Sequence, residues 1–134
     1  MQTRSTLLLL PALLFVLLCS CESGSQNALT FGTARDATGA GLAGESTTFT
    51  VGSGLTLWFR LESIADFDGR FVRLYFNSAE PRDFPACADT FTYICLSQFQ
   101  VSTPGTYTVE AYLVKMSGGT AQETLVATQT LTLQ

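Results

Sequence analysis

The sequence predicts an all-β protein, an antiparallel sandwich of about seven short strands. The chain after its first twenty residues is rich in Thr, Val, Phe, Tyr and Gly, the residues of strands and tight turns. Apolar and polar residues alternate in short segments at regular spacing. No long stretch repeats its apolar residues with the period of an amphipathic helix. These observations favour a sandwich or a barrel, and we prefer the sandwich.

The expected strands are the segments with period-two alternation, and Gly, Asp and Pro mark the breaks between them. They cover residues 28–33, 47–51, 55–61, 71–76, 92–96, 98–101, 106–116 and 123–133. The connections are a Gly-rich loop over 35–46, a turn over 66–69, a long polar connection over 77–90 and a turn at 118–119. Residues 55–61 alternate most clearly, with Leu57 and Phe59 facing one way and Trp58 the other.

The first twenty residues have the three parts of an export signal. Arg4 supplies the positive charge, residues 7–18 are apolar apart from Pro11, and Ser20 is the small residue before a cleavage site. The apolar run is shorter than the roughly 20 residues that a membrane-spanning helix needs.

The run Leu18-Cys19-Ser20-Cys21 resembles the lipobox of bacterial lipoproteins. That resemblance implies cleavage before Cys21 and acylation of its thiol, whereas an ordinary secretory signal without lipid is the alternative. Cys19 is the poorer acceptor because Leu18 would precede the cut.

We therefore expect a signal peptide over 1–20, a lipidated cysteine with a flexible polar tether over 21–28, and one sandwich domain over 29–134. The expected partner of the N-terminus is a membrane, reached through the lipid. Glu22 stands where an Asp would indicate retention at the inner membrane, which favours the outer membrane of a cell envelope.

Composition excludes several classes of function. The chain has 7 basic and 11 acidic residues and no histidine, and without Arg4 its net charge is about −5. Nucleic-acid binding needs clustered Lys and Arg, so we expect no such partner. The lack of histidine removes Ser-His-Asp and Cys-His catalysis and most zinc sites, and we expect no cofactor or metal. Asp66 and Asp68 resemble a fragment of a calcium loop, but we interpret them as turn residues.

Cys87 and Cys95 remain after processing and form an even pair in an oxidising compartment, so we expect a disulfide. Bridged Cα atoms lie within about 7 Å of each other. The chain between the two cysteines must therefore turn, although residues 91–94 have the composition of a strand. Either that stretch is bent or the pairing is wrong.

Residues 103–109, Thr-Pro-Gly-Thr-Tyr-Thr-Val, resemble the tyrosine corner of immunoglobulin-like domains. The resemblance implies that the ring of Tyr107 packs inward and that its hydroxyl bonds to a backbone group. Val109 stands where an antibody domain has a cysteine, so the antibody core disulfide is not reproduced.

The candidate binding residues are aromatic. Trp58, Tyr75 and Tyr112 fall on the faces opposite the apolar rows, and with Phe71 they could form an exposed patch for a protein or a glycan. The alternative is that they cover an outer sheet face. A second candidate surface is the connection holding Pro81, Phe84, Pro85 and Cys87, whose simpler interpretation is stabilisation of a long loop.

The main functional hypothesis is a cell-envelope lipoprotein that acts as a non-catalytic binding or scaffolding module. An accessory subunit of an envelope complex, joined by strand addition, is the second hypothesis. A small hydrolase is the third. It would need two facing carboxylates among Glu62, Asp66, Glu110 and Glu123, and nothing in the sequence marks such a pair.

Overall fold

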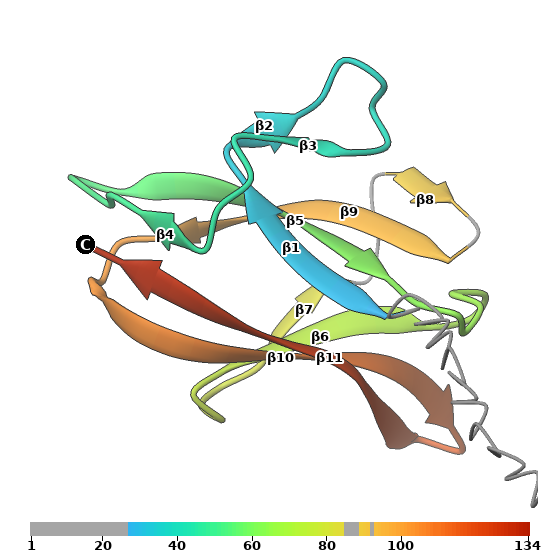
Figure 1. Ribbon diagram of the computed structural model, residues 1–134. Helices are drawn as coiled ribbons and strands as arrows, with labels where there is room; N and C mark the ends of the chain where they lie inside the picture. Colours follow the sequence, from blue (N-terminus) through green and yellow to red (C-terminus); the bar gives the residue numbers. More distant parts are fainter. Residues whose placement is uncertain (1–26, 85–88, 92) are drawn as a thin grey trace, which may run out of the picture.

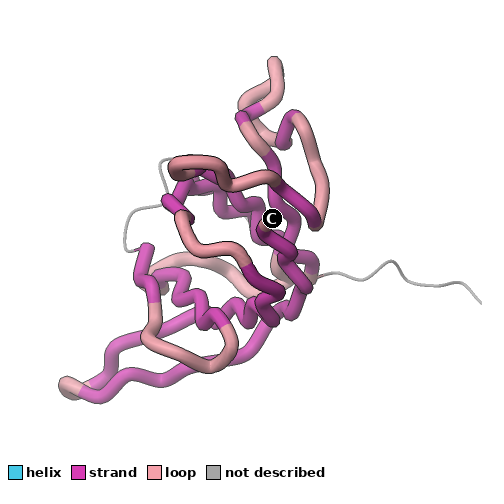
Figure 2. Tube along the Cα trace, turned by 90° about the vertical axis from the view of Figure 1, so that its left-hand side faces the viewer, coloured by secondary structure: helices cyan, strands magenta, loops and turns pink. Residues whose placement is uncertain are grey.

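The computed structural model describes residues 27–84, 89–91 and 93–134, and this part of the chain is built from strands and loops, with no helix (Figure 1, Figure 2). The all-β prediction is therefore confirmed. The signal peptide, Cys21, most of the tether and Cys87 lie outside the described residues. Since the described part has no helix, it has none that could cross a membrane.

Two larger sheets and one small ribbon make up the fold (Figure 1). The four-stranded sheet has the order β1 (Ala28–Gly32), β5 (Leu55–Glu62), β9 (Ile94–Val101) and β8 (Asp89–Phe91). The five-stranded sheet has the order β4 (Thr48–Phe49), β11 (Thr120–Leu133), β10 (Gly105–Ser117), β6 (Phe71–Phe76) and β7 (Arg82–Phe84). The ribbon pairs β2 (Ala34–Arg35) with β3 (Leu42–Ala43).

The two larger sheets share one hydrophobic core. Alternate residues of the strands point into it, and the fully buried ones include Leu57, Phe59, Leu61, Val72, Leu74, Val109, Ala111 and Leu131. Aromatic contacts join the sheets across the core. The ring centroids of Phe59 in β5 and Phe84 in β7 are 4.8 Å apart. Those of Phe76 in β6 and Phe99 in β9 are 5.5 Å apart. Because the buried faces meet, each sheet keeps one outward face.

Strand 71–76 matches its prediction, as does the alternation of residues 55–61. Two other predictions were wrong. The expected connection over 77–90 contains β7 and the start of β8, and the two pieces expected over 92–101 are one strand, β9. Cys95 and Leu96 are both buried, so the alternation that marks a strand is lost there.

The expectation of a purely antiparallel fold was also wrong. β4 pairs with β11 in parallel, through Thr48–Thr132 and Phe49–Leu133. The chain leaves β1 at the edge of one sheet and crosses to the edge of the other, so β4 runs in the same direction as the last strand. The Gly-rich loop over 35–46 holds the β2–β3 ribbon, and the predicted tether is shorter by one residue because Ala28 already belongs to β1.

The strand directions define two opposite ends of the fold (Figure 1). At the Asn27 end lie Asn27, the β5–β6 loop over 63–70, Tyr93 and the β10–β11 hairpin tip over 115–122. At the Gln134 end lie the C-terminus and the turns over 50–54, 77–81 and 102–104. The hairpin extends beyond β6, because Val114 is the last residue of β10 that pairs with it.

One side chain connects the edges of the two sheets. Gln129 in β11 accepts a hydrogen bond from the Thr130 N–H at 2.9 Å through Oε1, and its Nε2 donates to the Leu29 carbonyl of β1 at 3.4 Å. Both backbone groups would otherwise be free to pair with another strand, so Gln129 closes the gap between β1 and β11 at this level.

Candidate functional site

The outward face of the five-stranded sheet brings together three of the four predicted aromatic residues. Phe71 and Tyr75 alternate on β6 with the buried core residues Val72 and Leu74. Tyr112 lies on the neighbouring strand β10. The register pairs Tyr75 with Glu110, Arg73 with Tyr112 and Phe71 with Val114. We call Phe71, Arg73, Tyr75, Asp83, Glu110, Tyr112 and Glu123 the outer-face network.

Arg73 is the centre of this network. Its Nε and Nη2 donate to the two carboxylate oxygens of Asp83 at 2.7 and 2.9 Å, and its Nη1 donates to Glu123 at 2.6 Å. The guanidinium also lies 5.5 Å from the centroid of the Phe71 ring. A bidentate Arg–carboxylate pair is the geometrically specific form of an ion pair. Three strands, β7, β6 and β11, are joined through one side chain.

The pairing shifts the pKa values of these groups. Hydrogen bonds from Arg73 lower the pKa of Asp83, and those from Tyr75 and then Arg73 lower the pKa of Glu123. The pKa of Arg73 is raised by the same two carboxylates, Asp83 first. Both carboxylates are therefore ionised at neutral pH and engaged by donors, which makes them weak proton acceptors for any substrate.

The tyrosines are fixed in place by their hydroxyl groups. The Tyr75 hydroxyl donates to Glu123 at 2.6 Å, and the Tyr112 hydroxyl donates to Glu110 at 3.1 Å. Each hydrogen bond raises the pKa of its tyrosine. The two rings contact each other edge to face, with centroids 5.3 Å apart and planes at 80°. Because the rotamers are held, binding a ligand at these rings costs little further conformational entropy.

Apolar side chains extend this face toward the Asn27 end. Leu125 pairs with Tyr112 across β10 and β11 and is 49% exposed. Val114 is fully buried but does not belong to the central core, and its neighbours in the register are Phe71 and Glu123. The outward face thus combines ring edges, an exposed leucine and hydrogen-bonded charged groups with a surplus of carboxylates over the single Arg73, which is the chemistry of a recognition surface.

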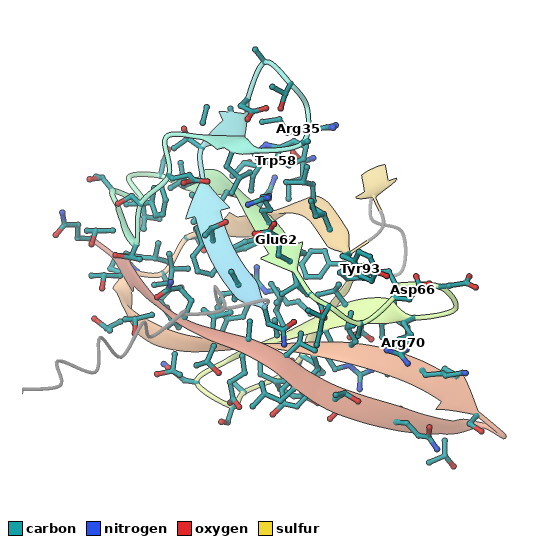
Figure 3. All side chains as sticks on the ribbon, turned by 45° about the vertical axis from the view of Figure 1, so that its right-hand side comes forward. Arg35, Trp58, Glu62, Asp66, Arg70 and Tyr93 are labelled. Atoms are coloured by element: carbon teal, nitrogen blue, oxygen red, sulfur yellow. The ribbon has the colours of Figure 1, made fainter. Side chains whose placement is uncertain are left out.

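Trp58, the fourth predicted residue, lies elsewhere. It points outward from β5 in the other sheet, is half-buried, and has the Arg35 guanidinium of β2 5.7 Å from its ring centroid (Figure 3). The small ribbon reaches over this side of the sheet. Alternation predicted correctly that Trp58 faces away from the core, but it could not show that β5 and β6 belong to different sheets.

Cys95 is fully buried and disulfide-bonded. β8 and β9 are antiparallel neighbours with Thr90 opposite Cys95, and Tyr93 between them has a left-handed φ of 72°. The chain thus makes the turn that the predicted disulfide requires. The pairing with Cys87 itself stays a prediction, since residues 85–88 lie outside the described part.

Asp66 has the turn role expected from the sequence. Its Oδ1 accepts a hydrogen bond from the Asp68 N–H at 3.0 Å, as in an Asx turn. Among the residues that the structure describes, no three His, Cys, Asp or Glu side chains cluster as metal ligands would.

A groove of about 430 Å³ opens at the Gln134 end between the two sheets. Its lining includes Phe76, Pro81, Arg82, Val101 and Tyr107. Arg82 lines it, donating to the Gln100 carbonyl at 2.6 Å with its guanidinium 5.1 Å from the Phe76 ring centroid. The groove is open to solvent, whereas the side chains of the outer-face network are fixed by hydrogen bonds, so the network is the better-defined candidate site.

Sequence reasoning missed the centre of the network. Residues 71, 73 and 75 are two positions apart and share one face of a strand, so the sequence already indicated an outward Arg73 between the outward Phe71 and Tyr75. Glu123 was weighed only as a member of a catalytic pair, and Asp83 was placed only within the long polar connection over 77–90. Their approach to Arg73 depends on β7 and β11 flanking β6 and β10, which alternation does not encode.

Comparison with family models, with curated proteins and with solved structures gave no match for this chain.

Proposed function

We propose that this protein is a lipid-anchored component of a bacterial cell envelope that binds a partner, a protein or a glycan, through the outer-face network. The anchor rests on the lipobox-like run ending at Cys21 and on the polar residues after it. The binding role rests on one observation: the edge-to-face pair of Tyr75 and Tyr112 is locked on an exposed sheet face by Arg73, Glu110 and Glu123. The network presents fixed rings and no reactive group.

We also propose that the fold is an immunoglobulin-like sandwich. Immunoglobulin domains place strands A, B, E and D in one sheet and G, F, C and often C′ in the other. The order β1-β5-β9-β8 against β11-β10-β6-β7 fits that arrangement, and β4 pairs with the last strand. The Tyr107 hydroxyl donates to the Thr103 carbonyl at 2.8 Å, which is the bond expected of a tyrosine corner.

Two cysteine variants test the anchor. Metabolic labelling with radioactive palmitate should mark the wild-type chain and Cys19→Ala equally, whereas Cys21→Ala should carry no label. Cys19 is the matched control because it precedes the expected cut by two residues. Label retained in Cys21→Ala would reject the anchor.

Site-specific photocrosslinking in cells tests the binding face. A photoreactive phenylalanine derivative replaces Tyr112 in one chain and Thr56, which is exposed on β5 of the other sheet, in the control. Crosslinks to protein or to cell-wall glycan are expected from position 112 and not from position 56. Equal yields at both positions would contradict a role for the outer-face network.

A second candidate function is that of an accessory subunit joined by strand addition. β11 runs from Thr120 to Leu133, and of the described strands only β4 pairs with its side away from β10, at Thr132 and Leu133. The part of β11 before Gln129 therefore offers a strand edge to which a partner strand could pair. Co-purification from detergent-solubilised membranes tests this role, and a protein that always elutes alone argues against it.

A further inference from the structure

Large apolar side chains are exposed at the Asn27 end of the fold. Of the described residues, four large hydrophobic side chains are strongly exposed, and three of them lie at this end: Ile64 at 60%, Met116 at 54% and Tyr93 at 48%. Single exposed apolar residues are ordinary on protein surfaces. Their concentration at the end where the chain from Cys21 enters the fold is what needs a physical reason.

Ile64 is held outward by its surroundings. The Ile64 N–H donates to Oδ1 of Asn27 at 3.0 Å, and the adjacent Ser63 N–H donates to the Tyr93 carbonyl at 2.8 Å. Phe67 of the same loop fills the core position and is 6% exposed, so Ile64 has no place in the core. The hydrogen bonds also tie Ile64 and Tyr93 to the start of β1 within one structured surface.

Met116 is presented by the β10–β11 hairpin. The hairpin extends past the first residue of β6 and turns at Gly118 and Gly119, whose φ values of 59° and 79° suit a tight two-residue hairpin turn. Met116 pairs with Ala121 within the hairpin. It therefore lies beyond the body of the sheet, and the hairpin tip that carries it is at the same end of the molecule as the β5–β6 loop (Figure 1).

The length of the tether sets how far this end can lie from a membrane. If Cys21 is acylated, as the proposed function holds, Asn27 follows the lipidated residue by six positions. Even a fully extended chain of six residues spans only about 20 Å. The Asn27 end is then the part of the fold that stays beside the bilayer surface.

We propose that the Asn27 end docks on the membrane interface, with Ile64, Met116 and Tyr93 inserted among the lipid headgroups. This inference rests on the proposed lipid anchor. Aromatic residues with a polar tip, such as Tyr93, are enriched at the membrane–water interface. The acyl chains supply the affinity, and the three side chains orient the fold because tethering makes their contact with the bilayer effectively intramolecular.

The charges at this end favour a neutral, zwitterionic lipid surface. Asp66 and Asp68 are exposed on the β5–β6 loop, and Arg70 follows them; Lys115 is exposed on the hairpin (Figure 3 labels Asp66, Arg70 and Tyr93 at this end). Two acidic and two basic groups balance, so electrostatic attraction to anionic lipids is not the driving force. Docking should therefore change little between low and high salt.

Quenching by brominated lipid tests the proposal on the full acylated chain. In a Trp58→Phe background, a single tryptophan is placed at Ile64→Trp, at Met116→Trp or at the control Ser53→Trp, which is exposed at the Gln134 end. The proteins are reconstituted in phosphatidylcholine vesicles brominated near the top of the acyl chains. An interfacial side chain sits about 5–10 Å into the headgroup boundary, so emission from positions 64 and 116 should fall about twofold and emission from position 53 should not change.

A second substitution checks that the two positions act together. Ile64→Asp in the Met116→Trp chain should reduce the quenching of the tryptophan at position 116, whereas Thr103→Asp at the Gln134 end should leave it unchanged. Exposed positions are chosen so that folding is not affected.

The outcomes separate the docking from the anchor. A chain without palmitate at Cys21 rejects the proposed function. A palmitoylated chain whose positions 64 and 116 are quenched no more than position 53 rejects the docking alone. Protection of both positions from aqueous iodide without quenching by brominated lipid, in a chain that sediments as a dimer, would show that a second copy covers this end and would also overturn the proposal.

Discussion

The hydroxyl of Tyr107 should stabilise the fold measurably. Tyr107→Phe removes the hydrogen bond to the Thr103 carbonyl and leaves the ring, which contacts Phe76 with centroids 6.2 Å apart. A typical intramolecular hydrogen bond contributes about 0.5–1.5 kcal/mol to stability. Packing is conserved in this variant, so the free energy of unfolding should fall by about 1 kcal/mol. For a fold of about 100 residues that corresponds to a Tm lower by about 4–8 °C.

Equilibrium urea unfolding measures the change. Trp58 is the only tryptophan and is half-buried beneath Arg35, so its fluorescence reports on the folded state. The assay uses residues 21–134 with Cys21→Ser, which cannot carry the proposed lipid. Tyr93→Phe is the matched control, because Tyr93 is 48% exposed, and it should change stability by less than about 0.5 kcal/mol.

The reasoning would be refuted by either of two results. Tyr107→Phe could unfold at the same urea concentration as the parent chain, which would mean that the Thr103 carbonyl is equally well served by water. The control could lose as much stability as Tyr107→Phe, which would mean that the corner has no special role. An unchanged m-value is required for both comparisons, because a change would indicate an altered unfolded state.

Three further variants test the core, the network and the ribbon. Leu74→Ala empties a fully buried core position and should lower the free energy of unfolding by about 2.7–5 kcal/mol in the same urea assay. The pKa of Glu123 is lowered in the fold from its ordinary 4.5, so its contribution to the free energy of unfolding is complete above pH 4.5 and is lost as the pH falls through the folded pKa. Glu123→Gln should therefore reduce the loss of stability on acidification, and an unchanged dependence of stability on pH in the acid range would contradict this. Gly32→Ala places a Cβ 2.7 Å from the Ala43 carbonyl oxygen, so β3 must move. Because Arg35 of the same ribbon lies over Trp58, the fluorescence emission of Trp58 should shift to longer wavelength. An unchanged spectrum would show that the ribbon does not depend on this close approach.

Much of the fold was readable from alternation because each strand has one face in the core. Residues 55–61 and 71–76 were predicted well, since buried Leu, Val and Phe alternate there with polar or aromatic residues. β7 was missed because it is only three residues long, follows Pro81 and lies at a sheet edge, where one exposed side removes the pattern.

The candidate site was predictable residue by residue but not as an assembly. The alternation of side chains along each strand correctly predicted that Phe71, Tyr75 and Tyr112 face away from the core. It could not separate Trp58 from them, because neighbours in sequence can enter different sheets. Pairing Arg73 with Glu123 needs contacts across 50 residues of chain, and no local pattern carries that information.

The amide of Gln129 bears on how copies of this protein coexist. A sheet edge with unpaired backbone groups can pair with the same edge of another chain and lead to aggregation. The Gln129 side chain engages the Thr130 N–H and the Leu29 carbonyl, so these two backbone groups are not available to pair with a strand of another chain. Gln129 thus protects one level of the seam against edge-to-edge pairing, whereas the part of β11 before it is paired on this side by none of the described strands.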